Sequence, residues 1–177
     1  MGSEALCTAA ILIAEMTLTN YHHGRALLEE HNPSAAKACF QAGADKGDPK
    51  CIYGLLAVAA IQGENLEAAK RQLESVMGQL TDMAQHADSD ACFIVARCYE
   101  TGCCVPQDMI TAVAYYSRAA SLGNADAMFN MGCFYMHQGC EGEQLAVQCF
   151  QKAADIGHPD AARALAHYYE THPGQHK

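Results

Sequence analysis

Small and apolar residues recur in the same order in two successive stretches of the chain. Residues 91–123 read ACFIVARCYETGCCVPQDMITAVAYYSRAASLG, and residues 127–157 read AMFNMGCFYMHQGCEGEQLAVQCFQKAADIG. Equivalent positions lie 36 residues apart in the first half and 34 apart in the second, because the middle loop of the second copy is two residues shorter. A period in this range predicts stacked helical hairpins, since one hairpin cannot bury its apolar face alone.

Residues that match between the two copies are small, aromatic or glycine. Two helices approach closely only where side chains are short, so the small residues mark the contact line of each hairpin. The aromatic residues supply bulk beside that line. The matched pairs are Ala91 with Ala127, Val95 with Met131, Ala96 with Gly132, Tyr99 with Tyr135, Ala112 with Ala146, Tyr116 with Phe150, Ala119-Ala120 with Ala153-Ala154, and Gly123 with Gly157.

The same pattern extends in both directions and predicts one all-α domain over residues 1–177. Residues 38–49 match 148–159, each with a glycine that ends a helix and a proline that opens the next. We predict a right-handed superhelical α-solenoid of four antiparallel hairpins and a capping helix, about nine helices in total. The repeats are expected at residues 5–47, 48–88, 89–123 and 124–157, with the capping helix at 159–171.

The first two repeats are the least regular, and their elements are predicted from local signals. The first helix of the opening hairpin is expected to end at Tyr21–Gly24, and Asn32 or Ser34 is expected to cap the second helix. Residues 65–87 read as one long amphipathic helix, or as two pieces broken near Gly78.

Charge and composition narrow the class of function. The formal net charge is −9, whereas a nucleic-acid binder needs a basic face, so we expect neither nucleic acid nor an anionic membrane as partner. The N-terminal apolar run contains Glu4, has no basic start, and is too short to span a membrane. We therefore expect a cytoplasmic protein whose ten cysteines are reduced.

The third repeat resembles the Sel-one-like repeat (SLR), a relative of the tetratricopeptide repeat. The family pattern AxxxLGxxYxxG, a short loop and AxxYYxxAAxxG is carried mainly by residues 91–123, and the fourth repeat keeps most of it. The resemblance covers about residues 39–171 and implies a solenoid that serves as an adaptor for other proteins. It brings no catalytic residues. A cysteine-rich, secreted branch of the family staples its repeats with disulfides at positions that are Ala119-Ala120 and Ala153-Ala154 here, so we expect no such framework.

Cysteine and histidine positions give no catalytic or cofactor signature. Cys103-Cys104, in the loop after Gly102, is expected to be an exposed thiol pair, and a redox or metal role for it stays open. The sequence contains no CxxC pair with a second matching pair, and no recognisable spacing of a nucleophile and a base, so we predict no metal site, no cofactor and no enzyme. The remaining cysteines within helices are read as small apolar fillers, namely Cys39, Cys92, Cys98, Cys133 and Cys149.

By the resemblance to tetratricopeptide arrays, a partner would bind along the concave face that the first helices line. Phe93 and Phe129 are aromatic where the repeat does not require it, and Arg97 and Arg163 are rare basic residues that suit an acidic peptide or a carboxylate. Packing between repeats and salt-bridged arginines are the alternatives. The candidate partner-binding residues are Tyr53, Phe93, Arg97, Phe129, Cys133, His137, Arg163 and His167.

The sequence thus predicts a protein–protein interaction module, acting as an adaptor, a scaffold or an inhibitor, with a partner protein or peptide that it does not name. One alternative is a regulatory subunit or inhibitor specific to one enzyme or toxin. Another is a thiol-based redox or metal-binding protein that uses Cys103-Cys104. Self-association also stays open, because the ends of a solenoid expose apolar faces unless they are capped.

Overall fold

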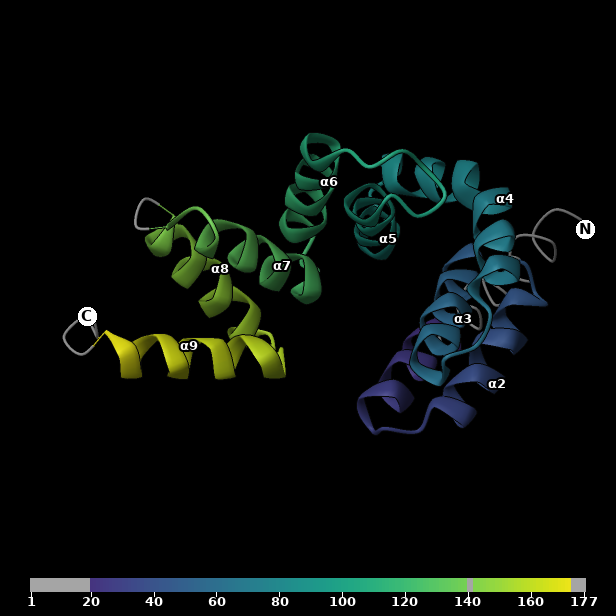
Figure 1. Cartoon of the computed structure of the whole chain (residues 1–177), viewed down its shortest axis with the longest axis horizontal. Helices are drawn as coiled ribbons and strands as arrows, with labels where there is room; N and C mark the ends of the chain where they lie inside the picture. Colours follow the sequence, from purple (N-terminus) through teal and green to yellow (C-terminus); the bar gives the residue numbers. More distant parts are fainter. Residues whose placement is uncertain (1–19, 140–141, 173–177) are drawn as a thin grey trace, which may run out of the picture. The chain divides into compact units, whose positions relative to one another are not determined.

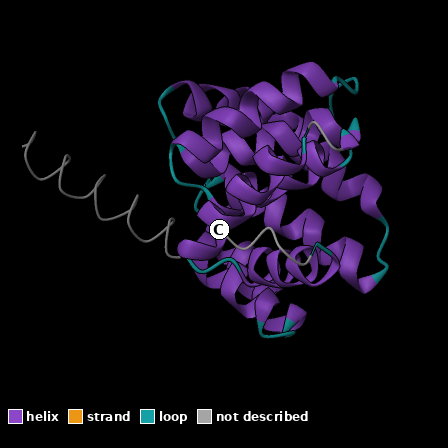
Figure 2. Ribbon diagram, turned by 90° about the vertical axis from the view of Figure 1, so that its left-hand side faces the viewer, coloured by secondary structure: helices purple, strands orange, loops and turns teal. Residues whose placement is uncertain are grey.

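A computed structural model describes residues 20–139 and 142–172 of the chain. Regular structure in these ranges is helical, without strands (Figure 2). The chain divides into two compact units, Met1–Leu80 and Thr81–Lys177. Residues 20–29 are helical, and the helices that follow are labelled in Figure 1: α2 (Pro33–Ala44), α3 (Pro49–Gln62), α4 (Leu66–Gln85), α5 (Ser89–Thr101), α6 (Met109–Ser121), α7 (Ala125–Met136), α8 (Glu143–Asp155) and α9 (Pro159–Thr171).

Most of these helices begin at a side chain that accepts a hydrogen bond from a backbone N–H of the first turn. Such a cap satisfies a donor that the helix itself cannot satisfy, and it stabilises the fold by about 0.5–2 kcal/mol. Asn32 caps α2, as predicted. Seven capping residues are seen in the described chain, namely Asn32, Asp48, Asn65, Asp88, Asp108, Asn124 and His158.

The aromatic ring of Phe40 organises the core of the first unit. It is fully buried on α2 and lies 6.1 Å from the ring of Tyr21. Gly24 and Gly54 face this ring so closely that an added Cβ would lie 2.5 and 2.4 Å from its atoms. The two glycines therefore admit the phenylalanine between two helices, one before α2 and one after it.

The predicted end of the first helix at Tyr21–Gly24 is wrong. The chain stays helical to residue 29, and the positive φ of 58° that follows the helix belongs to His31. Gly24 does not end the helix, and its role is the close approach to Phe40. Leu27 is consequently part of the helix.

Helix α4 is continuous, which confirms the long amphipathic helix. Gly78 does not break it, and an added Cβ at this position would meet no atom within 4 Å. Its buried residues are Leu73, Met77, Leu80 and Ala84, which recur at the three- and four-residue spacing of one helix face.

The second unit repeats one packing scheme in two hairpins. Helix α5 packs on α6 and α7 on α8, while α6 also contacts α7 and α8 contacts α9. The small residues matched in the sequence lie at these contacts. Buried positions that agree between the two hairpins are Ala91 and Ala127, Val95 and Met131, Ala96 and Gly132, Ala112 and Ala146, Tyr116 and Phe150, and Ala119 and Ala153.

Glycine ends both of these repeats in the left-handed conformation. Gly123 has a φ of 89° and Gly157 a φ of 92°, and each comes just before the cap of the next first helix. A residue with a Cβ would be strained there. In the described chain, no helix combines the length and the apolar character needed to cross a membrane.

Candidate partner-binding surface

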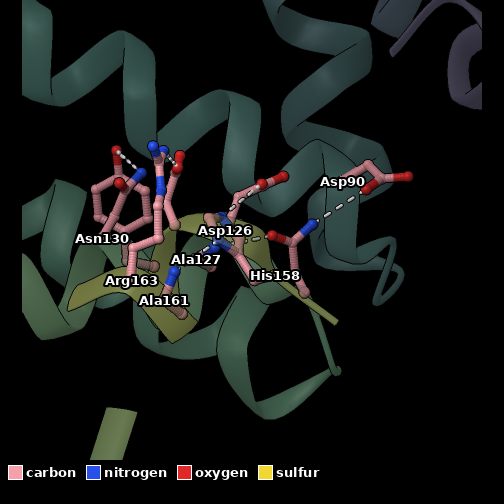
Figure 3. Close-up of polar contacts among 10 residues, drawn as sticks. Asp90, Asp126, Ala127, Asn130, His158, Ala161 and Arg163 are labelled. Carbon is pink, nitrogen blue, oxygen red and sulfur yellow. Dashed lines mark hydrogen bonds and ion pairs between the residues drawn. The ribbon is translucent and has the colours of Figure 1, made fainter. Parts of the chain in front are cut away.

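Adjacent first helices of the second unit are joined at their N-terminal ends. Asn124 caps α7 through Oδ1, which accepts a hydrogen bond of 2.9 Å from the Ala127 N–H, while its Nδ2 donates to Asp90 Oδ1 on α5 at 3.1 Å. His158 repeats this arrangement for α9. Its Nδ1 lies 3.3 Å from the Ala161 N–H, and its Nε2 lies 3.3 Å from Asp126 Oδ1 on α7 (Figure 3).

This pairing fixes how the first helices stand next to one another. Asp90 and Asp126 hold the same place in α5 and α7, as the second residue of the helix, and each receives the cap of the following first helix. Asn124 is buried, and the His158 side chain is 9% exposed. Hydrogen bonds between such buried polar groups hold a single register, because a shift would leave them unpaired.

The candidate residues of the second unit fall on one side of α5, α7 and α9, which we call the first-helix face. Phe93, Phe129 and Arg163 each lie five positions after the cap of their helix. Arg97, Cys133 and His167 lie one turn further along. The face consists of Phe93, Arg97, Glu100, Phe129, Asn130, Cys133, His137, Arg163 and His167.

Two of these candidates contribute to the core of the last hairpin. Phe129 and Cys133 are half-buried and pack against the cluster of Ala146, Phe150 and Leu165. The Phe129 ring is also stacked on His158, with 4.7 Å between ring centroids and 17° between planes. Burial raises the pKa of the Cys133 thiol above its ordinary value. Both residues therefore have a packing role.

Phe93 and Arg97 belong to a polar and aromatic group that joins three helices. The Phe93 ring is half-buried and lies 6.0 Å from the ring of Tyr116 on α6. Tyr116 donates a hydrogen bond of 2.7 Å to Glu100 Oε2, and Arg97 Nη1 lies 2.5 Å from that same oxygen. Asn130 Nδ2 on α7 donates a hydrogen bond to the Tyr116 hydroxyl at 3.4 Å.

We call Arg97, Glu100, Tyr116 and Asn130 the polar cluster. The side chains of Arg97 and Glu100 keep exposed fractions of 37% and 32%, so the charged end of the cluster reaches solvent. Burial, and then the hydrogen bond to Glu100, raise the pKa of Tyr116 well above its ordinary value. The hydroxyl is consequently a fixed donor to Glu100 and a fixed acceptor for Asn130.

Glu100, Tyr116 and Asn130 were not among the sequence candidates, although the repeat contains a signal for them. The position of Tyr116 is phenylalanine in the neighbouring hairpin, Phe150, and the position of Asn130 is Ala164 in α9. A hydroxyl and an amide therefore replace apolar groups at two positions that the structure brings within 3.4 Å of each other.

The other candidates are more dispersed. Arg163 forms an ion pair with Asp160 on its own helix and points to the same side as Asn130 in Figure 3. His137 and His167 are exposed. Tyr53 is half-buried on α3 in the first unit and lies outside the first-helix face.

The described cysteines divide into buried and half-buried thiols. Cys92 and Cys98 are buried, as expected for apolar fillers, and burial raises the pKa of Cys98 to about 12. Cys103 and Cys104 are half-buried, where an exposed pair was expected. Within residues 20–139 and 142–172, no group of three or more His, Cys, Asp or Glu side chains is placed to hold a metal ion.

Comparison with known proteins agrees with this architecture. The Sel1 repeat family model matches residues 9–48, 89–124 and 125–158. The chain belongs to the Sel1 repeat family. The last two matched ranges cover both hairpins of the second unit. Residues 49–88, with the long helix α4, lie between the first and the second matched range. No match to the chain was found among curated proteins.

Solved structures of Sel1 repeat proteins share the fold. A Sel1 repeat protein from Oxalobacter formigenes has 22% sequence identity and a TM-score of 0.56, over 89% of this chain and 65% of that one. A protective antigen present in uropathogenic Escherichia coli strains, which displays an SLR fold, has 21% identity and a TM-score of 0.54, over 90% of this chain and 34% of that one. This chain thus spans less than two thirds of either protein. The likeness confirms the predicted all-α solenoid fold.

Proposed function

We propose that this Sel1 repeat chain is a protein-binding module without catalytic activity, and that a partner segment binds on the first-helix face of α5 and α7. The observation that carries the proposal is the polar cluster beside Phe93. It places charged groups, a half-buried aromatic ring and an amide on adjoining helices, at positions where the neighbouring repeat has apolar side chains. Aromatic and arginine side chains in such settings carry much of the energy of protein interfaces.

The charges of the face favour a partner with both donors and acceptors over a purely acidic one. Arg97 is paired with Glu100, and Arg163 with Asp160, so neither arginine lacks a counter-charge. A backbone segment of a partner offers N–H groups to Glu100 and C=O groups to Arg97 and Asn130. Such a segment would also place an apolar side chain against Phe93. This contact would add to the binding affinity and fix the position of the segment along the face.

Adaptor, scaffold and inhibitor remain the three forms of this function, and a regulatory subunit or inhibitor of one enzyme or toxin is the narrower version. They differ in the number and affinity of partners. An inhibitor or regulatory subunit has one tight partner, whereas an adaptor or scaffold holds at least two proteins at once. Competition between captured partners separates these forms.

Site-specific photocrosslinking tests the surface directly. A photoreactive phenylalanine analogue replaces Phe93, and a matched analogue replaces the exposed Leu145 on α8, which is 46% exposed and outside the first-helix face. In lysate of the source cells, we expect the analogue at position 93 to crosslink to one discrete protein. The analogue at position 145 should not crosslink to that protein. The same partner from both positions, or none from position 93, overturns the proposed surface.

A loss-of-binding pair completes the test. Arg97→Ala removes a charged group of the polar cluster, while Lys152→Ala removes an exposed charge on α8. We expect the crosslink from position 93 to be lost in the first variant and kept in the second, with both variants retaining their helical circular dichroism. Phe129 is unsuitable as a probe because it packs against the cluster around Phe150.

A further inference from the structure

Two adjacent thiols lie in contact in the loop between α5 and α6. Cys103 Sγ and Cys104 Sγ are 3.6 Å apart, and both residues are half-buried, so solvent reaches the pair. Side chains of adjacent residues in an extended backbone point to opposite sides. Here Cys104 has a φ of 67°, which is uncommon for a residue with a Cβ, and the two sulfurs lie on the same side.

The loop around this pair is closed by hydrogen bonds at both ends. The Cys103 N–H donates to Cys98 O at 3.1 Å, directly after Gly102 ends α5 with a φ of 70°. On the far side, the Asp108 N–H donates to Tyr99 O at 3.0 Å, and Gln107 Nε2 donates to Glu100 O at 2.8 Å. These bonds tie the loop to the last turn of α5, so the sulfurs are held together by the fold.

Most of the other described thiols are in a different environment. Cys51, Cys92 and Cys98 are buried, and burial raises the pKa of each. Cys149 is half-buried, and its pKa is also raised by burial. The thiolate is the nucleophile in disulfide exchange, so a raised pKa protects these residues from reaction at neutral pH.

We propose that Cys103 and Cys104 form a reversible disulfide-exchange site, which closes to a bond between the two adjacent cysteines when it meets a low-molecular-weight disulfide. One thiolate attacks a sulfur of the small disulfide, and a mixed disulfide forms as one small thiol leaves. The second thiolate then attacks the protein sulfur of this mixed disulfide, and the second small thiol leaves. The pair loses two electrons and two protons, and the small disulfide is reduced to two thiols.

Adjacency makes the bond easy to open again. Cα atoms joined by a trans peptide are about 3.8 Å apart, whereas disulfides usually join Cα atoms about 4.4–6.8 Å apart. A disulfide between neighbours is therefore strained, and strained disulfides are the more readily reduced ones. The site thus suits reversible modification and not permanent cross-linking.

Mass spectrometry after exchange with glutathione disulfide tests the proposal. The reduced full-length chain is incubated with glutathione disulfide at pH 8, quenched with acid, unfolded and alkylated. Trypsin together with a glutamyl endopeptidase cleaves after Glu100 and Arg118, so Cys98 is separated from the peptide 101–118 that contains the pair. We expect this peptide to be lighter than its reduced form by two hydrogen atoms, to carry neither alkyl group nor glutathione, and to recover two alkylatable thiols after dithiothreitol.

Three variants act as controls. Cys103→Ser and Cys104→Ser each leave a single thiol, which should retain glutathione as a stable mixed disulfide. Cys149→Ser removes a thiol on α8 that is distant in sequence from the pair. This variant should form the bond between Cys103 and Cys104 as the wild type does. A wild-type peptide that remains reduced, retains glutathione on both cysteines, or stays joined to the Cys98 peptide overturns the proposal. None of these outcomes depends on the partner-binding surface.

Discussion

The Tyr116 hydroxyl on α6 donates a hydrogen bond of 2.7 Å to Glu100 Oε2 on α5. The equivalent residue of the next hairpin is Phe150, which is buried against α7 and α9 without a hydroxyl. Packing alone therefore does not require a tyrosine at this position. The hydrogen bond is present in the hairpin of α5 and α6 and has no equivalent in the hairpin of α7 and α8. It joins Glu100, the ion-pair partner of Arg97, to the buried Tyr116.

The first prediction concerns this hydroxyl. Tyr116→Phe should keep the fold and lower the free energy of unfolding by about 1 kcal/mol, because Glu100 loses one donor but keeps Arg97 and some contact with solvent. Urea unfolding measures the change, and Tyr115→Phe on the same helix is the control. Partner binding should weaken in the first variant only. A loss above about 3 kcal/mol would show that the hydroxyl is part of the core and not a separable functional group.

The second prediction concerns the cap that joins α9 to α7. His158→Asn should lower stability by only about 0.5–1 kcal/mol, because asparagine can make both hydrogen bonds, as Asn124 does one repeat earlier, but loses the stacking on Phe129. His158→Ala should lower stability by about a further 1–2 kcal/mol, because α9 also loses its cap and Asp126 loses a donor. Thermal and urea unfolding compare the pair. Equal stability of the two variants would contradict the proposed role of the cap.

The repeated part of the fold could be predicted from sequence because each packing constraint appears twice. Ala96 and Gly132 stand at one position, Tyr116 and Phe150 at another, and comparison of the copies separates what packing needs from what varies. The first repeat has no such regular copy beside it. Gly24 was therefore assigned to a helix end, whereas it lies against the ring of Phe40.

The candidate surface was harder to predict than the fold. Helical spacing correctly places Phe93 and Phe129 at equivalent positions, but it cannot say how much of each ring is covered, and Phe129 packs on His158 and the core cluster. The polar cluster depends on contacts between residues 100, 116 and 130, which belong to three different helices. Such contacts follow from tertiary packing and have no local sequence period.

The third prediction compares two helical glycines. Gly132→Ala should lower the free energy of unfolding by about 1–3 kcal/mol, because its Cβ would lie 2.5 Å from the Phe150 ring and the core would have to shift. Gly78→Ala should raise stability by about 0.5–1 kcal/mol, because this position of α4 is open and alanine favours a helix. Urea unfolding of both variants measures the contrast. A neutral Gly132→Ala would show that α7 and α8 approach less closely than described.

The last prediction concerns alkaline pH. Burial raises the pKa of Cys98 and of Cys51 to about 12, from the ordinary thiol value of 9.0. Each folded thiol stays neutral where the unfolded one ionises, so its contribution to stability is present below pH 9 and is lost as the pH rises towards 12. The loss reaches about 1.4 kcal/mol per pH unit for each such thiol. Under reducing conditions, the melting temperature should therefore fall between pH 9 and pH 11. Other titrating groups add to this fall, so the contribution of one thiol is measured by comparison with a variant that lacks it.

Cys98→Ala isolates the contribution of one thiol. The variant should be less stable than the wild type at pH 7.5, because a buried sulfur is lost, and the difference should narrow as the pH rises to 11. Tyr116 contributes in the same direction, since its pKa is also raised, but it is present in both proteins and cancels in the comparison. A stability difference that stays constant from pH 7.5 to 11 would mean that Cys98 ionises equally easily in the folded and unfolded chains.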